Sequence, residues 1–542
     1  MLVLEEEYKR CCQSMAPPWA PRPIIVNVLK EFQRNYDEHN NSVAFMQLPT
    51  GYGKSTITLA LASHVICKGH LGRGVIHVLP LRGIITDLSK RLGKWFPLVG
   101  LSTRDLAAQH MGSAGSPFFA KHAVVTTLDT FSLNFFKLPA VEVSKALRTG
   151  NAHFEFPRGQ IYSSIVIFDE SHLFALDNSS TYKQMFTILL STLTQLACAG
   201  VPIFVITATL PTKIREYIQK QLFDSRIITS VYKQGDDPLF ENKEGRRKIS
   251  TSILSTDEEA IKTIKTARSQ KPRILVIVNE VSRAIHFYKK LEDYSPVLLH
   301  GRITESERKV NVDRLYATNS WLVIGTQVIE AGIDVDANVL VTDLAPMDRL
   351  VQRIGRVART GNGSEGEVYV IPNYSTVYPA SDLKKTLQML DRSGKDIDWV
   401  FGAQQLVDDA YSTLSVPDMI DRNLLGFLER IDENLLYGSG DMRDLLTALG
   451  SFPREAVLIK AYADAFFDNK TLTDPDGYIG LESWKAYQAL CNSKKVVENN
   501  RIVELEPEML RDIGPHNLQR RLEQHGYNGI LLDHYERGVG YL

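Results

Sequence analysis

Two glycines, a lysine and a hydroxyl side chain stand together in Leu48–Ser55 (LPTGYGKS), between a short apolar run and a longer run with helical spacing. Gly51 and Gly53 let the backbone curl so that its N–H groups point at phosphate oxygens. The helix that follows would add the positive end of its dipole. Lys54 would reach the β- and γ-phosphates, and the Ser55 hydroxyl would ligate Mg²⁺. The segment predicts a phosphate-binding loop, with an ordinary strand–turn–helix connection as the alternative.

Two adjacent carboxylates follow an apolar run in Ile165–His172 (IVIFDESH). Carboxylates at the end of a buried strand are costly unless a cation pairs with them. Mg²⁺ is a natural partner for Asp169, usually through water. Glu170 could then polarise the attacking water as a general base. The alternative is a helix N-terminus that uses Asp169 or Ser171 as its cap.

Three polar side chains could couple this site to its surroundings. His172 is close enough in sequence to link the carboxylates to the neighbouring strand end. Thr207 and Thr209 flank an alanine at the end of a second apolar strand, where their hydroxyls could bridge the nucleotide site to a bound strand. Threonine is common at strand ends, so the pattern by itself is weak.

A basic segment, Val351–Arg359 (VQRIGRVAR), follows much later in the chain. On a helix, Gln352, Arg356 and Arg359 are four and three residues apart and would share one face. The arginines repel one another unless an anion faces them, and a γ-phosphate across an inter-domain cleft would supply that anion. A solvated basic face is the alternative. Just upstream, Asp334 could meet a ribose hydroxyl.

The elements that must position these residues are short β-branched strands that alternate with helices. Strands that are apolar on both faces indicate a parallel sheet covered on both sides. The helix after the phosphate-binding loop is expected to end in Lys68 and Gly69, a cationic last turn and a C-terminal glycine. The first series of expected strands is 42–47, 74–79, 123–127, 165–168 and 203–206.

A polar stretch at 233–248 reads as a linker because it is rich in charges and turn formers. A second alternating series follows, with strands expected at 274–278, 297–299, 322–324, 339–341 and 367–371. The sequence therefore predicts an α/β protein with two tandem parallel-sheet domains, 1–235 and 236–375, and a mostly helical C-terminal domain, 376–542.

Length and composition set limits on what these domains can be. The chain of 542 residues should hold about three domains. A net charge of -1 argues against a polycation that coats nucleic acid by bulk charge. The five cysteines are sparse, unpaired in C-x-x-C spacing, and suit a reducing compartment. Without a signal peptide or a long apolar run, the expectation is a cytoplasmic protein with no membrane segment.

The motifs LPTGYGKS, DESH, TATLP, GTQVIEAGID and QRIGRVAR, in this order, resemble the helicase motifs of superfamily 2. A general phosphate loop has glycine at position 48, where this chain has leucine. The loop pattern of that superfamily, A-x-T-G-x-G-K-[ST], does not have glycine there, which explains Leu48. The segment Thr342–Arg359, with the TQVIEAGIDVD run before it, is similar to the CRISPR-associated interference helicase of type I systems. The resemblance covers about residues 40 to 375.

The resemblance implies two RecA-like domains and DExH-type ATP hydrolysis with Mg²⁺. It assigns catalysis to Lys54, Asp169, Glu170, Gln352, Arg356 and Arg359, with Ser55 and Asp169 as metal ligands. It assigns ATP binding to Pro49, Thr50, Gly51, Tyr52, Gly53, Lys54, Ser55, Gly332 and Asp334. Segments similar to the strand-contacting segments of the family carry Arg82, Thr126, Thr127, His300 and Thr326, each of which could equally be a satisfied polar residue at a strand end.

The implied activity is 3′-to-5′ translocation on single-stranded DNA, with a crRNA-guided type I surveillance complex as partner. Many members of the family also carry an N-terminal HD nuclease. None of the 13 histidines here is followed by aspartate, and about 45 residues precede the first strand. The expectation is therefore a stand-alone helicase subunit that works with a separate HD nuclease.

Two other functions stay open at this point. A DExH-type RNA helicase would share the same motifs and differ in its nucleic-acid preference. A recruitment scaffold could use the nucleotide as a structural clamp, although Glu170 and the arginine pair would then have no water to activate or charge to stabilise.

Overall fold

The computed structural model describes residues 3–541 except for 81, 111–112, 138–154, 177–181, 223–224, 245–246, 331–332, 334, 360–364, 394–396, 429–458, 482, 506–512, 515–517, 519–520, 523–524 and 533. These residues form two compact units. The first comprises 1–250, 345–366 and 376–453, and the second comprises 251–344, 367–375 and 454–542. This interleaved division differs from the three consecutive domains expected, because segments far apart in the chain pack together.

The first unit is built on an eight-stranded sheet in the order β4-β3-β5-β2-β6-β7-β1-β8. Neighbouring strands are parallel apart from the antiparallel pair β3 and β4. All five strands expected here are confirmed, and the sheet adds three more. The strands are β1 (Val43–Gln47), β2 (Gly74–Leu79), β3 (Leu106–His110), β4 (Ser113–Ala114), β5 (Ala123–Thr127), β6 (Ser164–Phe168), β7 (Ile203–Thr207) and β8 (Ile227–Val231).

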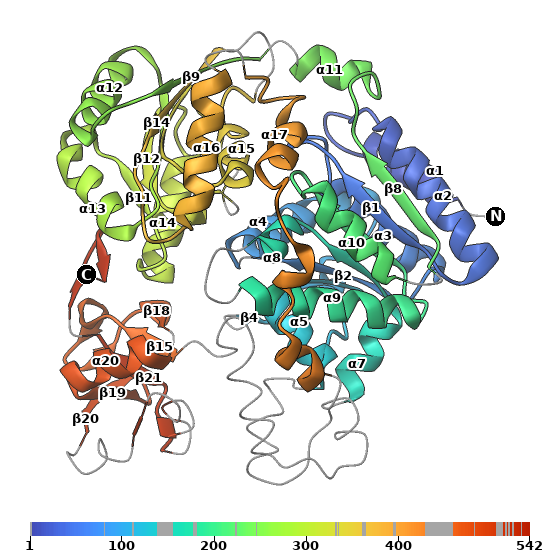
Figure 1. The fold of residues 1–542 in the computed structure, drawn as a ribbon. Helices are drawn as coiled ribbons and strands as arrows, with labels where there is room; N and C mark the ends of the chain where they lie inside the picture. The colour runs from blue at the N-terminus through green and yellow to red at the C-terminus, as the bar shows by residue number, and fades with distance from the viewer. Residues whose placement is uncertain are drawn as a thin grey trace. The chain divides into compact units, whose positions relative to one another are not determined.

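Helices cover this sheet, as Figure 1 shows for α2 beside β8. One core joins side chains of α1 to α4 to one face of the strands, and includes Phe32 with its ring centroid 4.1 Å from that of Phe204. The helices of this unit are α1 (Leu4–Gln13), α2 (Pro23–His39), α3 (Ser55–Lys68), α4 (Arg82–Trp95), α5 (Leu128–Phe135), α7 (Glu155–Tyr162), α8 (His172–Ala175), α9 (Tyr182–Cys198), α10 (Thr212–Gln221), α11 (Pro238–Glu244), α15 (Met347–Ile354), α16 (Ala380–Ser393) and α17 (Ala403–Ala410).

The stretch expected to be a linker contains helix α11. Phe240 of this helix is buried, and its ring centroid lies 5.0 Å from that of Tyr52 in the phosphate-binding loop. Arg22 lies over both rings and pairs with Asp237 at 3.3 Å. The charged composition of the stretch concealed a short apolar anchor, so composition alone gave the wrong local structure.

A six-stranded sheet in the order β11-β12-β10-β13-β14-β9 forms the second parallel layer. The second series of expected strands is confirmed as β10 (Arg273–Ile277), β11 (Val297–Leu299), β12 (Trp321–Gly325), β13 (Val339–Asp343) and β14 (Glu365–Ile371), with β9 (Lys248–Ile253) added at the edge. The accompanying helices are α12 (Asp257–Gln270), α13 (Val281–Lys290) and α14 (Glu305–Tyr316). The predicted pair of parallel-sheet domains is therefore confirmed.

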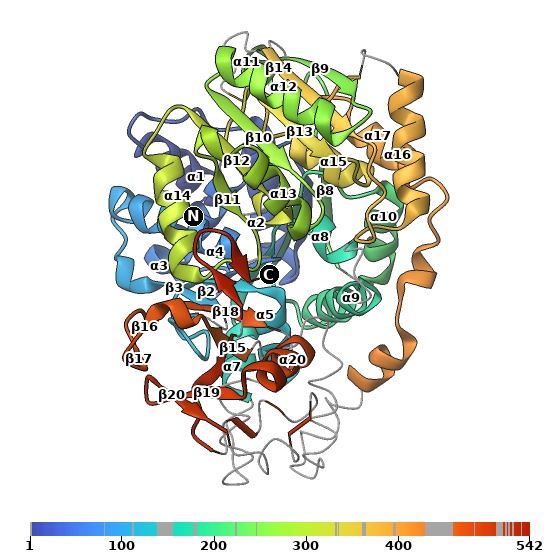
Figure 2. The same cartoon turned by 90° about the vertical axis from the view of Figure 1, so that its left-hand side faces the viewer.

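In the described residues of the C-terminal third, a mixed sheet accompanies the expected helices. Besides α16, α17 and α20 (Ser483–Ser493), this third holds a seven-stranded mixed sheet against which α20 packs (Figure 2). These strands have only two to four residues, too few for a period-of-two pattern to stand out. They are β15 (Ile459–Tyr462), β16 (Phe467–Asp468), β17 (Thr471–Leu472), β18 (Tyr478–Leu481), β19 (Lys495–Glu498), β20 (Arg501–Glu504) and β21 (Gly529–Leu531), followed by the hairpin β22 (Tyr535–Glu536) and β23 (Gly540–Tyr541).

Candidate active site

The phosphate-binding loop has the predicted setting, a turn between β1 and α3. Gly51 and Gly53 have φ of +81° and +94°, the left-handed region that only glycine adopts without strain. Helix α3 begins at Ser55 and ends at Lys68, with Gly69 in the left-handed conformation as its cap. The loop therefore presents backbone N–H groups and a helix N-terminus, which together suit a polyphosphate.

The two carboxylates lie at the end of β6, facing this loop. Lys54 Nζ is 3.5 Å from Glu170 Oε1, and the Asp169 Oδ1 atom accepts a hydrogen bond from the N–H of Glu170 at 2.8 Å. Glu170 has φ of 52°, a sparsely populated conformation for a non-glycine residue. Backbone strain of this kind costs about 1–3 kcal/mol and collects at functional sites.

The pKa values of the two neighbouring carboxylates are shifted in opposite directions. Burial alone would raise the pKa of Asp169, but the hydrogen bond with His77 and the charge of Lys54 bring it below its usual value. Burial raises the pKa of Glu170, an effect that Lys54 and Arg356 oppose and that the Asp169 charge reinforces. An ionised aspartate beside a more basic glutamate suits a metal ligand beside a general base.

The donor set fits Mg²⁺ held jointly with a nucleotide. Lys54 Nζ is buried and, apart from its 3.5 Å ion pair with Glu170, makes no hydrogen bond to any residue that the structure describes, so it keeps donors for phosphate oxygens. Within the same described residues, no group of three or more His, Cys, Asp or Glu side chains could hold a metal. Mg²⁺ commonly needs only one or two protein ligands plus phosphates and water. Ser55 and Asp169 would be those ligands.

A chain of polar contacts joins the carboxylates to α15. His172 Nδ1 lies 3.5 Å from Glu170 Oε2 and 3.0 Å from Thr207 Oγ1. Thr207 Oγ1 accepts the N–H of Thr209 at 3.3 Å, and Thr209 Oγ1 accepts from Gln352 Nε2 at 3.0 Å. Burial, with the charges of Arg349 and Lys54, lowers the pKa of His172 well below its usual range. The predicted coupling residues thus form one buried path with a neutral imidazole.

The basic segment was predicted to form one continuous helix, and this prediction is wrong. Helix α15 ends at Ile354, and the N–H groups of Arg356 and Val357 bond three residues back, to Arg353 and Ile354. Ala358 has φ of 55°. Gln352 is therefore helical, whereas Arg356 and Arg359 lie in the turn beyond it and do not share its helical face.

Glycine at 355 lets this turn approach the phosphate-binding loop. A Cβ atom on Gly355 would lie 3.2 Å from Thr50 Oγ1 and 3.2 Å from the carbonyl oxygen of Val351. The charge of Arg356 opposes the rise that burial causes in the pKa of Glu170. The first unit thus gathers the loop, the carboxylates, Gln352 and Arg356 at one site.

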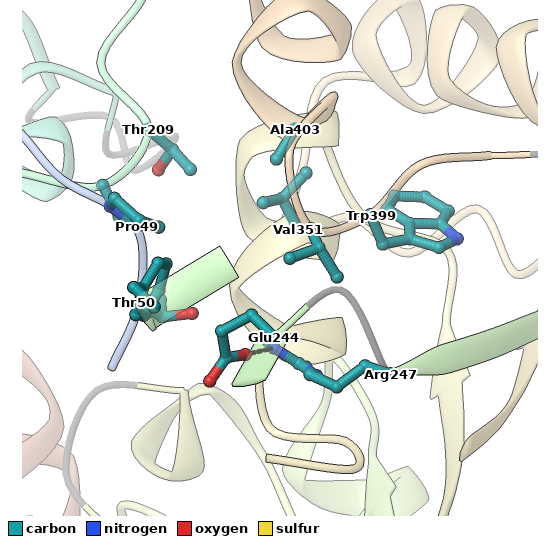
Figure 3. A pocket seen from close by; sticks show the side chains of 12 residues that line it. Pro49, Thr50, Thr209, Glu244, Arg247, Val351, Trp399 and Ala403 are labelled. Carbon is teal, nitrogen blue, oxygen red and sulfur yellow. Dashed lines mark hydrogen bonds and ion pairs between the residues drawn. The ribbon is translucent and has the colours of Figure 1, made fainter. Parts of the chain in front are cut away.

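A pocket beside the loop continues this site. Figure 3 shows Pro49, Thr50 and Thr209 facing Val351, Trp399 and Ala403, with the ion pair of Glu244 and Arg247 below. Arg247 donates to Glu244 at 2.7 Å and to the carbonyl oxygen of Val357 at 2.6 Å. Glu244, the last residue of α11, and Arg247 beyond it therefore support the turn that carries Arg356.

Sequence reasoning missed His77, in the middle of β2. This side chain is 1% exposed, its Nε2 lies 3.4 Å from Asp169 Oδ2, and its Nδ1 lies 2.7 Å from Thr58 Oγ1. A proton on Nε2 suits the carboxylate, which leaves Nδ1 to accept from the threonine hydroxyl. A lone histidine in an apolar strand gave no signal, because its partner lies on the neighbouring strand.

Replacing His77 with alanine should weaken Mg²⁺-dependent hydrolysis. Partners that orient a metal ligand typically contribute about 10–100-fold to metal affinity or activity. We expect the Mg²⁺ concentration for half-maximal ATPase to rise by about ten-fold, while His39→Ala, at the exposed end of α2, leaves it unchanged. An unaltered Mg²⁺ dependence in His77→Ala would show that Asp169 needs no support from this side chain.

The residues predicted to contact DNA are mostly enclosed by protein. Thr126 Oγ1 donates to the carbonyl oxygen of Gln109 at 2.7 Å, and Thr127 Oγ1 caps α5 by accepting the N–H of Thr130 at 3.2 Å. Thr326 is 4% exposed. These contacts suit polar residues satisfied at strand ends, so their DNA-binding role stays a prediction. Arg82 begins α4, and its side chain, like Gly332 and Asp334, lies outside the described residues.

His300 is fully buried in the second unit, under the C-terminal hairpin. Its Nε2 donates to the carbonyl oxygen of Val539 at 2.8 Å, and Nδ1 accepts the N–H of Arg302 at 3.1 Å. Burial lowers the pKa of His300 to about 4, and the charges of Arg308 and Arg302 add to this effect. The imidazole is therefore neutral and structural in this arrangement.

This depressed pKa predicts acid sensitivity. Below about pH 6.5 the unfolded histidine gains a proton while the folded one does not, so stability is complete above that pH and is lost as the pH falls towards 4. Between pH 7 and pH 4, wild type should lose about 3 kcal/mol more unfolding free energy than His300→Gln. Urea unfolding at both pH values measures this difference. Equal losses in the two proteins would contradict the buried neutral state.

Comparison with known proteins gives two family matches, one over the N-terminal motifs and one over the later motifs. Residues 30–217 match the DEAD/DEAH box helicase model, and residues 270–362 match the C-terminal model of CRISPR-associated nuclease/helicase Cas3. Among curated proteins, a CRISPR-associated helicase Cas3 of Thermoproteus tenax is 26% identical over 73% of this chain and 69% of its own length. A putative nuclease/helicase Cas3 of Methanocaldococcus jannaschii is 26% identical over 75% of this chain and 57% of its own.

Solved structures agree on the fold. T. fusca Cas3 with ATP matches with a TM-score of 0.58 at 18% identity, over 88% of this chain and 62% of that one. A chain of a CRISPR RNA-guided surveillance complex in a pre-nicking state matches with a TM-score of 0.56 at 17% identity, over 85% of this chain and 60% of that one. This chain thus spans less than two thirds of several of the proteins it resembles. In its motif order, its two parallel sheets and these matches, the chain is similar to the Cas3-like helicases, with the DEAD/DEAH box helicase match over residues 30–217.

Proposed function

We propose that the chain is an ATP-driven motor that translocates 3′ to 5′ along single-stranded DNA and unwinds duplex in type I CRISPR interference. The observation that carries the proposal is the convergence of Lys54, the Asp169–Glu170 pair, Gln352 and Arg356 at one strand edge. A clamp that only held nucleotide would need neither a raised glutamate pKa nor an arginine beside it. The similarity to Cas3 proteins supports DNA as the track.

The side chains would divide the work of hydrolysis among them. The loop N–H groups and Lys54 would bind the β- and γ-phosphates, and Ser55 and Asp169 would hold Mg²⁺, which would supply positive charge against the phosphates. Glu170 orients the attacking water and accepts its proton, because burial makes this carboxylate more basic. Arg356 stabilises the charge that develops on the γ-phosphate. Gln352 donates a hydrogen bond to Thr209, and through Thr207 and His172 this bond couples the nucleotide site to the carboxylates.

The proposed partners are a crRNA-guided surveillance complex and a separate HD nuclease that cuts the strand being moved. A structurally similar chain occurs in such a complex, which supports the first partner. The given sequence contains no His-Asp pair among its 13 histidines, so these residues do not themselves supply a nuclease site of that type. Cleavage of single-stranded DNA by this chain with a divalent metal and no other protein would refute the second proposal.

The experiment that tests the motor is steady-state ATPase with and without nucleic acid. Single-stranded DNA of about 40 nucleotides should stimulate hydrolysis several-fold, and RNA of the same sequence should not. Stimulation by RNA alone would favour a DExH RNA helicase. Negligible turnover with every nucleic acid, but intact nucleotide binding, would favour a recruitment scaffold.

Among the described residues, none of the helices has the length and apolar composition needed to cross a membrane.

A further inference from the structure

Helix α17 supplies a cap for α10, a helix that cannot cap itself. Helix α10 begins at Thr212 after Pro211, which has no side-chain group to accept from the first turn. Asp408 of α17 fills this role: its Oδ1 accepts the N–H of Thr212 at 2.7 Å, and its Oδ2 accepts from Thr212 Oγ1 at 3.0 Å. A carboxylate at a helix N-terminus is favoured by both the unpaired N–H groups and the helix dipole.

A second contact fixes the turn just before α10. Gln404 Nε2 donates to the carbonyl oxygen of Leu210 at 3.0 Å, and Gln47 Nε2 of β1 donates to the same oxygen at 2.8 Å. Leu210 directly follows Thr209, whose hydroxyl accepts from Gln352. Two side chains of α17 therefore hold the residues on either side of Pro211, next to the threonine that meets α15.

Tyr411, the residue that directly follows α17, holds α15 itself. Tyr411 donates from its hydroxyl to Asp348 Oδ1 at 2.6 Å, and Asp348 lies in the first turn of α15. Asp348 is 0% exposed and Tyr411 is 9% exposed, so this hydrogen bond is shielded from water. Ala403 and Val351 face the same pocket, one from each helix (Figure 3). Helix α17 thus contacts both partners of the bond between Gln352 and Thr209.

We propose that α17 is a bracket that sets the position of Gln352 for hydrolysis, with Asp408 and Tyr411 as positioning residues. The two elements that meet at Gln352 and Thr209 are separated by 143 residues in the chain. One hydrogen bond between side chains cannot fix the orientation of two such elements, whereas a third element bonded to each of them can. This inference rests on the proposed ATPase and adds residues that none of the helicase motifs contains.

The bracket makes a prediction that simple packing does not. If Asp408 acts by holding the partner of Gln352, its removal should matter only while Gln352 is present. We expect Asp408→Ala to lower the kcat of the DNA-stimulated ATPase by about ten-fold, with the KM for ATP changed by less than about two-fold. In a Gln352→Ala background the same substitution should cost less than about two-fold more. Asp408→Asn, which keeps an acceptor for the Thr212 N–H, should recover part of the rate.

The matched control is Asp409→Ala, on the same helix. Its side chain is exposed and accepts from Gln405 within α17, so the rate should stay at the wild-type value. Tyr411→Phe removes only the hydroxyl and should lower kcat in the same direction as Asp408→Ala. Tyr411→Phe and Asp408→Ala should both keep the wild-type melting temperature to within a few degrees.

Three outcomes would overturn the bracket: equal losses from Asp408→Ala with and without Gln352, no loss in either background, or the same loss in Asp409→Ala. Misfolding of Asp408→Ala would leave Tyr411→Phe and Asp408→Asn to decide, since both keep the volume of the original side chain. The proposed function is tested separately by wild type against Lys54→Ala. An ATPase that depends on Lys54 but ignores Asp408 and Tyr411 would reject the bracket alone.

Discussion

Replacing Lys54 with alanine is expected to abolish DNA-stimulated ATP hydrolysis, with a loss of at least about 100-fold in kcat. Lys54 Nζ is buried beside Glu170 and has no other ionic partner among the described residues. Removing it takes away the charge that meets the phosphates and leaves the carboxylate pair without its main neutralising cation. Steady-state phosphate release with saturating single-stranded DNA measures the effect.

Lys68→Ala provides the control for this substitution. Lys68 lies at the opposite end of α3 and is exposed, so it shares the helix but not the site. This variant should hydrolyse ATP at the wild-type rate. Lys54→Ala with more than about a tenth of wild-type activity would mean that hydrolysis takes place elsewhere or that the loop binds nucleotide in another way.

Replacing Glu170 with glutamine is expected to lower kcat by about 1,000-fold while leaving ATP binding nearly intact. The amide keeps the shape of the side chain but cannot accept the proton of the attacking water. Binding of a fluorescent ATP analogue should match wild type, because Glu170 contacts Lys54 and is not assigned to the phosphates. Glu216→Gln, on the exposed face of α10, is the matched control.

The pH profile gives a second test of Glu170. Burial raises the pKa of Glu170, and only the ionised form accepts a proton, so the rate should fall as the pH drops through a value above the usual glutamate range. The residual activity of Glu170→Gln should lack this acidic limb. An identical limb in both proteins would assign the titration to another group.

Local motifs carried most of what could be predicted about the site. The phosphate-binding loop and the carboxylate pair each lie within eight consecutive residues, between elements whose apolar patterns are clear, and the structure confirms those elements. Glycine at 51 and 53 is required by the backbone conformation itself, so sequence and geometry agree there. His172, Thr207 and Thr209 were predicted because they occur at strand ends that a parallel sheet brings to one edge.

Contacts between distant segments could not be predicted. His77 meets Asp169 only because β2 and β6 are neighbours in the sheet, and Asp408 meets Thr212 across 196 residues of sequence. The hydrophobic periodicity of the sequence does not predict such pairs. The helical face expected for Arg356 and Arg359 failed for a local reason, since the turn at Gly355 ends α15 and the spacing rule no longer applies.

The most direct test of the central claim is displacement of streptavidin from single-stranded DNA biotinylated at one end. With ATP and Mg²⁺, the wild-type protein should displace streptavidin from the 5′ end faster than from the 3′ end, because a 3′-to-5′ motor moves towards the 5′ end. Lys54→Ala should displace neither. Displacement without ATP, a preference for the 3′ end, or activity on RNA alone would contradict a 3′-to-5′ DNA translocase.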